Sequence, residues 1–176
     1  MSPFKISPLE SADRPAVETL LDRVFGRDRR NRSSYRLRAG NPSCPALSFA
    51  AWMDGRLVGS VQQTRVAVGD AGARALLLGP LAVEPELRGQ GIGRALLRRS
   101  LDAARAAGWS HVFLVGEQDY YEPLGFAPAD AVGVSVAGEP ADRVHHMPLI
   151  PDSPAPRGEL RAWPQPCRGG DTGAAR

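Results

Sequence analysis

The chain is poor in cysteine and almost free of lysine. Among its 176 residues there are two cysteines, Cys44 and Cys167, whose separation matches neither a disulfide framework nor the spacing of metal ligands. We therefore expect two reduced thiols, as is typical of a cytoplasmic protein, and no metal site. The single lysine, Lys5, excludes the nucleotide-triphosphate P-loop, because that motif ends in Gly-Lys-Ser or Gly-Lys-Thr.

Long hydrophobic runs and basic segments interleaved with aromatic residues are also missing. No apolar stretch approaches the roughly 18 residues that a membrane span needs, and residues 1–20 lack the charged start and apolar core of a signal peptide. The net charge is +3, but the basic residues are scattered and aromatic residues make up 6% of the chain. These absences predict a cytoplasmic protein with neither a membrane nor a nucleic acid as its partner.

The length and composition indicate a small globular protein. With 176 residues, of which 43% are hydrophobic and 23% charged, we expect a single domain over residues 1–150. Residues 151–176 are rich in Pro and Gly and predict a partly flexible tail. Within this tail, Trp163 favours packing of residues 158–164 against the domain, because a large apolar side chain is seldom left in water.

Hydrophobic periodicity and turn signals predict alternating strands and helices. One helix starts near Ser11 or Asp13 and ends at Gly26, and a second spans residues 91–107. Residues 27–45 predict a loop with weak helical tendency at 34–38. Strands are expected at 4–8, 47–53, 56–68, 73–83, 111–115, 126–137 and 143–150, with a short helix at 117–124. The order predicts an α/β fold of the α+β type, with a mixed, mostly antiparallel sheet flanked by helices and one β-α-β crossover.

The most informative segment spans residues 78–97. It predicts a buried strand, a turn and a loop that leads directly into the helix at residue 91. Gly89, Gly91 and Gly93 lie where this helix begins, so no side chain keeps a ligand away from the backbone. The first N–H groups of a helix have no partner inside it and carry partial positive charge. This helix start therefore predicts a site for phosphate or pyrophosphate.

The spacing of the glycines decides between nucleotide-binding motifs. The dinucleotide fingerprint Gly-x-Gly-x-x-Gly fails in both registers, because its third glycine falls on Arg94 or on Leu96. The pattern that fits is Arg-x-x-Gly-x-Gly, spelled by residues 88–93 after an apolar strand that ends at Val83. This pattern closely resembles the acyl-CoA-binding motif of the GNAT superfamily of N-acetyltransferases.

A second motif follows at the place where that superfamily has one. Residues 116–126 resemble the family's Tyr-x-x-x-Gly-Phe element, which is formed here by Tyr121, Gly125 and Phe126. The Tyr-Tyr pair before Gly-Phe is similar to the YhbS-like branch of small bacterial acetyltransferases. The two motifs stand in the family's order and about 30 residues apart.

The resemblance, which covers roughly residues 4–150, implies the GNAT fold and direct transfer of an acetyl group from acetyl-CoA to a primary amine of a small molecule or peptide. Loop residues implied to bind the pyrophosphate are Arg88, Gly89, Gln90, Gly91, Ile92, Gly93 and Arg94. The preceding strand is implied to splay from its neighbour and to offer its backbone to the pantetheine arm at Leu81, Ala82 and Val83. Tyr121 is implied to protonate the departing thiolate, with Tyr120 as the alternative if the short helix is turned.

Several roles stay open. The general base is not identified, since Glu84, Glu117, Asp119 or a chain of waters would each serve. His145 and His146 are adjacent in a predicted strand, so we expect them to face opposite sides, one packed and one exposed. The same site without turnover would make the protein a non-catalytic acyl-CoA-binding sensor. A homodimer is common among such folds, but no residue pattern specifies it or the amine acceptor.

Overall fold

Nine strands build one mixed sheet in the computed structural model, which describes residues 3–163. Cys167 and the expected flexible end of the tail lie outside the described residues. Seven strands follow the order β1-β2-β3-β4-β5-β8-β6, and β9 pairs with β3 and β7. Their bounds are β1 Lys5–Pro8, β2 Phe49–Met53, β3 Arg56–Val68, β4 Ala73–Val83, β5 His111–Val115, β6 Ala127–Pro128, β7 Val134–Ser135, β8 Val144–Pro148 and β9 Gly158–Ala162. The pairs β4–β5 and β7–β9 are parallel and the others antiparallel, which confirms the predicted mixed sheet.

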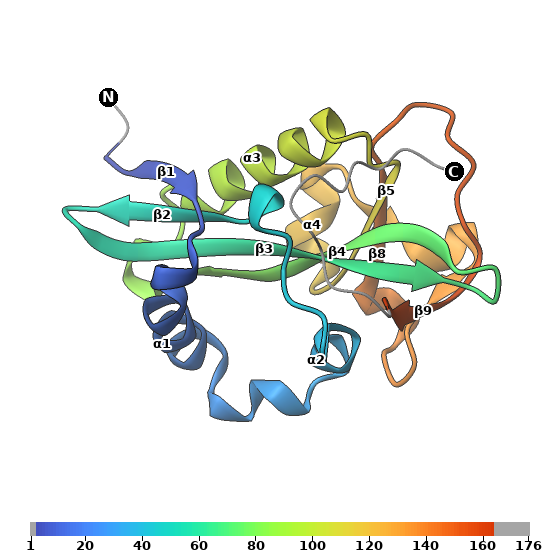
Figure 1. The fold of residues 1–176 in the computed structure, drawn as a ribbon, viewed down its shortest axis with the longest axis horizontal. Coiled ribbons are helices and arrows are strands. Elements are labelled where there is room, and N and C mark those ends of the chain that lie inside the picture. Colours follow the sequence, from blue (N-terminus) through green and yellow to red (C-terminus); the bar gives the residue numbers. More distant parts are fainter. Residues whose placement is uncertain (1–2, 164–176) are drawn as a thin grey trace.

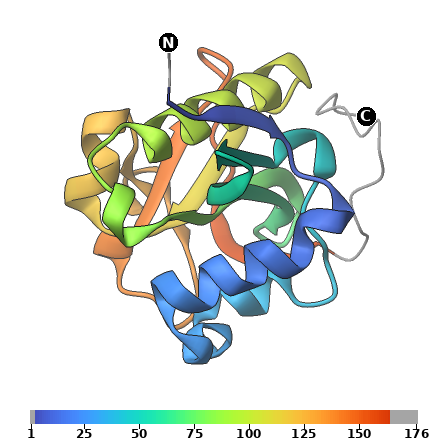
Figure 2. The ribbon, with the colours of Figure 1, turned by 90° about the vertical axis from the view of Figure 1, so that its left-hand side faces the viewer.

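Helices cover both faces of this sheet (Figures 1 and 2). Helix α3, Ile92–Ala106, lies on one face, and α1, Arg14–Phe25, and α2, Ser33–Arg38, lie on the other. The short α4, Gln118–Tyr121, follows β5. Short 3-10 helices span Ser11–Asp13, Arg27–Asn31, Pro45–Leu47, Pro85–Leu87, Glu122–Leu124, Ala129–Val132 and Ala141–Arg143. The two long helices confirm the sequence predictions, and no helix of the described chain is long and apolar enough to cross a bilayer.

The two faces of the sheet have separate hydrophobic contacts. Helix α3 buries Ile92, Leu96 and Leu97 in the largest core cluster, together with side chains from β2 to β5. Helix α1 buries its apolar stripe in a second cluster with residues of β2, β3 and β4. Each helix is therefore fixed by burial of one apolar face against the same sheet.

Strands β4 and β5 are joined by α3 and form the predicted β-α-β crossover. They are parallel and pair through Leu76–Val112 and Leu77–Phe113. Beyond this short ladder β4 continues to Val83, and the described chain offers it no ladder partner on that side. On its other side β4 stays paired with β3, with one register shift between Val61 and Gln63. The strand therefore leaves part of one edge unpaired next to the glycine loop.

The segment at 126–137 is not the continuous strand that the sequence predicts. Strand β6 pairs with β8, a 3-10 helix follows, and β7 pairs with β9 instead. Gly133 has φ of +75°, a left-handed conformation that interrupts an extended strand. Residues 158–162 form β9, so the sheet extends past residue 150, and the predicted packing of this segment is confirmed.

Both histidines of β8 are buried, although they face opposite sides as predicted. His145 is 0% and His146 is 5% exposed, so the prediction that one of them is exposed is wrong. The reason is that both faces of β8 are covered, by the Tyr121 ring beside His145 on one face and by Phe113 and His111 beside His146 on the other. Nε2 of His146 lies 3.0 Å from Nδ1 of His111, and its ring stacks on Phe113 with centroids 4.9 Å apart.

Cys44 follows α2 and is also buried. It is disulfide-bonded, so the prediction of a reduced thiol is wrong at this residue. The local spacing of two cysteines does not decide whether a thiol is oxidised. The N–H of Cys44 donates to the carbonyl of Gln63 at 2.7 Å, which ties this loop to β3.

Acidification is expected to destabilise the fold through the histidine pair. Burial, together with the nearby His111, lowers the pKa of His146 to about 4. Between that value and the ordinary pKa of about 6.5, the unfolded chain binds the proton and the folded chain does not. The free energy of unfolding should therefore fall by about 2 kcal/mol between pH 7 and pH 5 because of His146.

Urea unfolding at pH 7, 6 and 5 measures this loss. The variant His146→Gln carries no titratable ring and should show a much smaller loss over the same range. An equally steep loss in the variant would mean that other groups cause the pH dependence.

Candidate functional site

The glycine loop enters α3 with backbone N–H groups uncovered. Gly91 is the N-cap, with φ of +83°, and no side chain caps this end of the helix. The N–H of Ala95 donates to the Gly91 carbonyl at 2.9 Å, so the N–H groups of residues 92–94 precede the first intrahelical bond. The first turn also contains no acidic side chain. An anion would therefore find free donors and a positive helix end here.

The outer side of the loop is open. A Cβ atom added at Gly89 or Gly91 would meet no atom within 4 Å. Arg88, Gln90 and Arg94 are exposed around this space, and within residues 3–163 neither arginine forms an ion pair. The structure therefore brings the predicted loop residues together at one solvent-exposed helix start.

The unpaired edge of β4 lies directly before this loop. The N–H of Glu84 donates to the Val58 carbonyl at 2.9 Å, which makes these two residues a hydrogen-bonded pair of the antiparallel ladder. Such pairs alternate along a ladder, so Ala82 also directs its backbone groups toward β3. Leu81 and Val83 direct theirs to the opposite side, where β5 no longer runs. Of the three predicted strand residues, two thus offer free backbone groups.

Tyr120 and Tyr121 are neighbours in α4 but have different surroundings. The Tyr120 hydroxyl reaches the start of α3, since a Cβ atom at Gly93 would lie 2.7 Å from it, and Tyr120 is 47% exposed. The Tyr121 ring instead packs edge-on against Phe126, with centroids 5.8 Å apart. Burial raises the pKa of both phenols above the ordinary value, far more for Tyr121. Tyr121 is therefore a fully protonated hydroxyl at neutral pH.

The position of Tyr121 is fixed from β5 and β8. A Cβ atom at Gly116 would overlap the Tyr121 ring, so only glycine lets the ring lie flat on this turn. Nε2 of His145 lies 3.1 Å from the Gly116 carbonyl, and the His145 ring lies 6.3 Å from the Tyr121 ring. The buried His145 thus supports both the turn and the ring. Sequence reasoning missed this role, because it depends on the pairing of β5 with β8.

The three acidic residues considered as general bases differ in burial and in their ion pairs. Glu84 is 2% exposed, and its Oε1 pairs with Arg23 and, at 2.9 Å, with Arg56. Glu117 is exposed and pairs with Arg143, and Asp119 is exposed. Glu84 and Glu117 are thus already engaged by arginine side chains. We therefore assign no general base.

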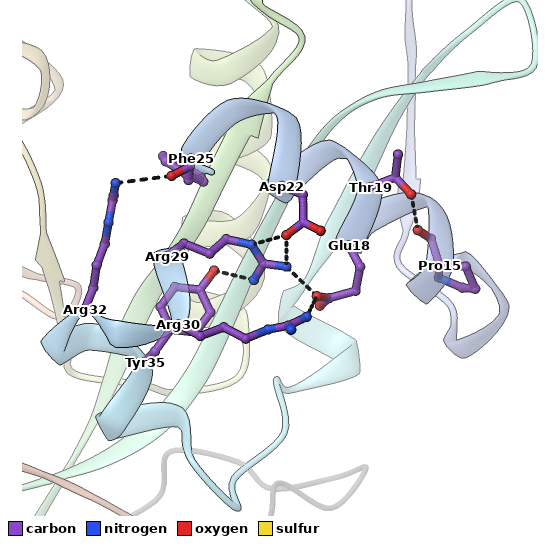
Figure 3. Close-up of polar contacts among 9 residues, drawn as sticks. All are labelled: Pro15, Glu18, Thr19, Asp22, Phe25, Arg29, Arg30, Arg32 and Tyr35. Atoms are coloured by element: carbon purple, nitrogen blue, oxygen red, sulfur yellow. Dashed lines mark hydrogen bonds and ion pairs between the residues drawn. The ribbon is translucent and has the colours of Figure 1, made fainter. Parts of the chain in front are cut away.

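Residues 27–38, for which the sequence predicts a loop with weak helical tendency at 34–38, form a 3-10 helix and then α2, and one buried arginine organises both (Figure 3). Arg29 is 1% exposed and donates to Glu18 at 2.5 Å, to Asp22 at 3.0 Å and to the Tyr35 hydroxyl at 2.9 Å. Burial alone would lower the pKa of Arg29, but the hydrogen bonds to Glu18 and Tyr35 outweigh it and raise the pKa. Arg29 therefore connects α1, which carries both carboxylates, to α2, which carries Tyr35.

Helix α2 also carries a half-buried arginine, Arg38. Its Cζ lies 5.2 Å from the centroid of the Tyr35 ring, and its Nη2 would lie 3.0 Å from a Cβ atom at Gly79 of β4. Its Nε is shielded from water and has no hydrogen-bond partner. Burial lowers the pKa of Arg38 to about 10, and the groups that oppose this shift are Tyr35 and Tyr121. Arg38 thus lies at the start of the unpaired β4 edge, within electrostatic range of Tyr121.

Comparison with known proteins identifies relatives of this arrangement. The family model described as the acetyltransferase (GNAT) family matches residues 14–126. The N-acetyltransferase YjhQ of Escherichia coli (strain K12) is 34% identical over 127 residues, which are 71% of this chain and 70% of that protein. The N-acetyltransferase YhbS of the same strain is 30% identical over 115 residues, or 65% and 68% of the two chains.

Solved structures show the same fold. YhbS from Escherichia coli in complex with CoA superimposes with a TM-score of 0.81 at 23% identity, over 93% of this chain and 91% of that one. A GNAT family acetyltransferase from Brucella melitensis in complex with acetyl-CoA gives 0.69 at 23% identity, over 93% and 98%. At this identity the structural likeness concerns the fold alone.

Removing the Arg29 side chain should loosen the α1–α2 connection. In Arg29→Gln, Glu18 and Asp22 lose their buried cation, and we expect the free energy of unfolding to fall by about 2 kcal/mol. Arg30 also pairs with Glu18 but is 66% exposed, so Arg30→Gln should change stability by less than about 0.5 kcal/mol. Urea unfolding of both variants measures the two losses of stability. Equal losses in Arg29→Gln and Arg30→Gln would contradict the role given to Arg29.

Proposed function

The chain belongs to the GNAT family of acetyltransferases and has the fold of that family, and on this premise we propose that it moves the acetyl group of acetyl-CoA to a primary amine of a small molecule or peptide. Acyl transfer from CoA is the chemistry of the family, whereas the acceptor class, the direct attack and the residue roles below are proposals. The observation that supports them best is the unpaired β4 edge that leads into an uncapped helix start.

The residues present fit acetyl-CoA. The pyrophosphate would bind the N–H groups of the loop and first turn, residues 88–94, where glycine leaves the backbone open. The side chains of Arg88 and Arg94 would add positive charge at its rim. The pantetheine arm would continue the sheet along β4 through the free backbone groups of Leu81 and Val83. The backbone of Ala82 pairs with β3, so Ala82 would form no hydrogen bond to the ligand.

The β4 edge would also place the reacting carbonyl. As the amine attacks, negative charge develops on the thioester oxygen, and a fixed N–H donor aimed at that oxygen lowers the barrier. The N–H of Leu81 is directed to the unpaired side of β4, where the pantetheine arm would lie, and would serve as this donor. Binding of the nucleotide part at the loop, remote from the reaction, would orient the acetyl group.

Tyr121 would protonate the thiolate that leaves. Burial keeps the phenol protonated at neutral pH, and the nearby Arg38 cation lowers the energy of the phenolate that remains after the transfer. Its ring is fixed by Gly116 and His145, so the hydroxyl has a defined position. Tyr120, whose hydroxyl lies over the start of α3, is the alternative donor.

Release of free CoA thiol from acetyl-CoA, measured with and without a panel of primary amines, tests the proposal. Release that depends on an amine supports the transferase. Binding of acetyl-CoA without release for any amine would favour the non-catalytic sensor instead.

A negative charge in the loop should prevent cofactor binding. In Gly91→Asp the carboxylate would face the pyrophosphate, and we expect at least a 100-fold loss of acetyl-CoA affinity. Because a Cβ atom at Gly91 meets no neighbour and Asp tolerates φ of +83°, the variant should fold. Gly91→Asn has the same shape without the charge and should lose much less. Calorimetric titration compares the three proteins, and equal affinities would show that no phosphate lies at this loop.

The proton donor can be separated from its neighbour by paired substitutions. Tyr121→Phe should lower kcat by about 10²-fold or more, the range for loss of a general acid, with little change in acetyl-CoA affinity. Tyr120→Phe should leave kcat within a few-fold. Initial rates of thiol release measure both, and a reversed order would assign the donor role to Tyr120.

A further inference from the structure

Two arginines at the α1–α2 side of the sheet, the buried Arg29 and the half-buried Arg38, differ in one respect. Arg29 has two carboxylates and a hydroxyl as partners. Arg38 has the face of Tyr35, and within residues 3–163 no carboxylate pairs with it. The Nε of Arg38 is shielded from water without a hydrogen-bond partner. A cation that is partly removed from water without a counter-charge is costly, unless a ligand supplies the anion.

The position of Arg38 is set by the fold. Leu37, next to it in α2, is buried in a core cluster with residues of β3 and β4. The N–H of Asn41 donates to the Arg38 carbonyl at 3.0 Å, and the Asn41 side chain donates to the Arg65 carbonyl at 2.6 Å. Tyr35, which lies against the guanidinium, is itself fixed by Arg29 (Figure 3). The backbone at Arg38 is therefore fixed on both sides, and the Tyr35 ring lies against the guanidinium.

The guanidinium of Arg38 lies near the part of β4 where the acetyl group would react. Gly79, where an added Cβ atom would lie 3.0 Å from the guanidinium, is two residues before Leu81 on the same strand. Tyr121, the proposed proton donor, is within electrostatic range. The pyrophosphate site lies at the other end of this segment, at the start of α3, and has its own donors. An anion at Arg38 would therefore belong to the acceptor and not to the nucleotide.

We propose that Arg38 binds a carboxylate of the acceptor, and that the acceptor is a small molecule with its carboxylate next to the reacting primary amine, as in an α-amino acid. This inference rests on the proposed acetyl transfer. A planar guanidinium matches a carboxylate in shape and in hydrogen-bond geometry. A single cation balances one negative charge, whereas a phosphate ester would leave a second charge without a partner.

Matched acceptors test the proposal. Each α-amino acid of a panel is compared with its α-carboxamide, which keeps the amine and the side chain and lacks only the charge. The amine of the amide is less basic and more of it is neutral, so intrinsic reactivity favours the amide. We expect kcat/KM for the best acid to exceed that of its amide by about 100-fold, through KM, because the amide leaves the half-buried cation unpaired.

Variants assign the preference to Arg38. In Arg38→Gln the ratio of acid to amide should fall to about one, and Arg38→Lys should retain part of it. Arg32→Gln, an exposed arginine of the same segment, should keep the wild-type ratio. Arg38→Gln removes a cation that lacks a partner, so its urea midpoint should not fall, which shows that the variant is folded.

Three results would overturn the proposal. One is a wild-type enzyme that prefers the amides. Another is an equal loss for acids and amides in Arg38→Gln, which would mean that Arg38 acts through Tyr121. If no amine is acetylated, the proposed function fails, and the inference about Arg38 is tested separately by calorimetric titration of N-acetyl amino acids in the presence of CoA. Binding to the wild type that is lost in Arg38→Gln supports the inference. Absence of binding to the wild type overturns it.

Discussion

The separation of β4 from β5 is the constraint on which the rest of the site depends. The two strands share a short parallel ladder and then diverge, while β3 holds the other edge of β4. Because an antiparallel ladder uses backbone groups alternately, Leu81 and Val83 keep theirs free on the side that β5 leaves. The same strand then turns into the glycine loop and the uncapped start of α3. A continuous line of backbone donors and acceptors results, which suits a long ligand with a pyrophosphate at one end.

Polar contacts from outside the sheet fix the two sides of this line. On the α3 side, Gly116 and His145 position the Tyr121 ring. On the α1 side, Arg29 positions Tyr35, which lies against the guanidinium of Arg38. The arginine that has its counter-charges supports the arginine that lacks one. Stability of the fold and the proposed recognition of the acceptor are thereby linked through a single helix of six residues.

The sequence predicted those features that depend on residues close together along the chain. The start of α3 was predictable, because the spacing of glycines at a helix start can be seen in the sequence. Tyr121 was singled out by the resemblance to the family's Tyr-x-x-x-Gly-Phe element. The partners of Arg29 were not predictable, since the carboxylates that bind it come together only when α1 packs beside the following turn. The prediction that one of His145 and His146 is exposed was wrong, because the rings that cover the two faces of β8, Tyr121 and Phe113, come from other elements of the chain. The interruption at Gly133 reflects a left-handed residue that hydrophobic pattern alone does not reveal.

Calorimetric titration of the purified protein with acetyl-CoA, and separately with CoA, tests most directly whether the unpaired strand and the glycine loop form a cofactor site. The account predicts saturable binding of both ligands at one site per chain, because the nucleotide and pantetheine parts that contact the loop and β4 are common to them. Absence of binding for both would contradict it, and would mean that this chain has the GNAT fold without its ligand.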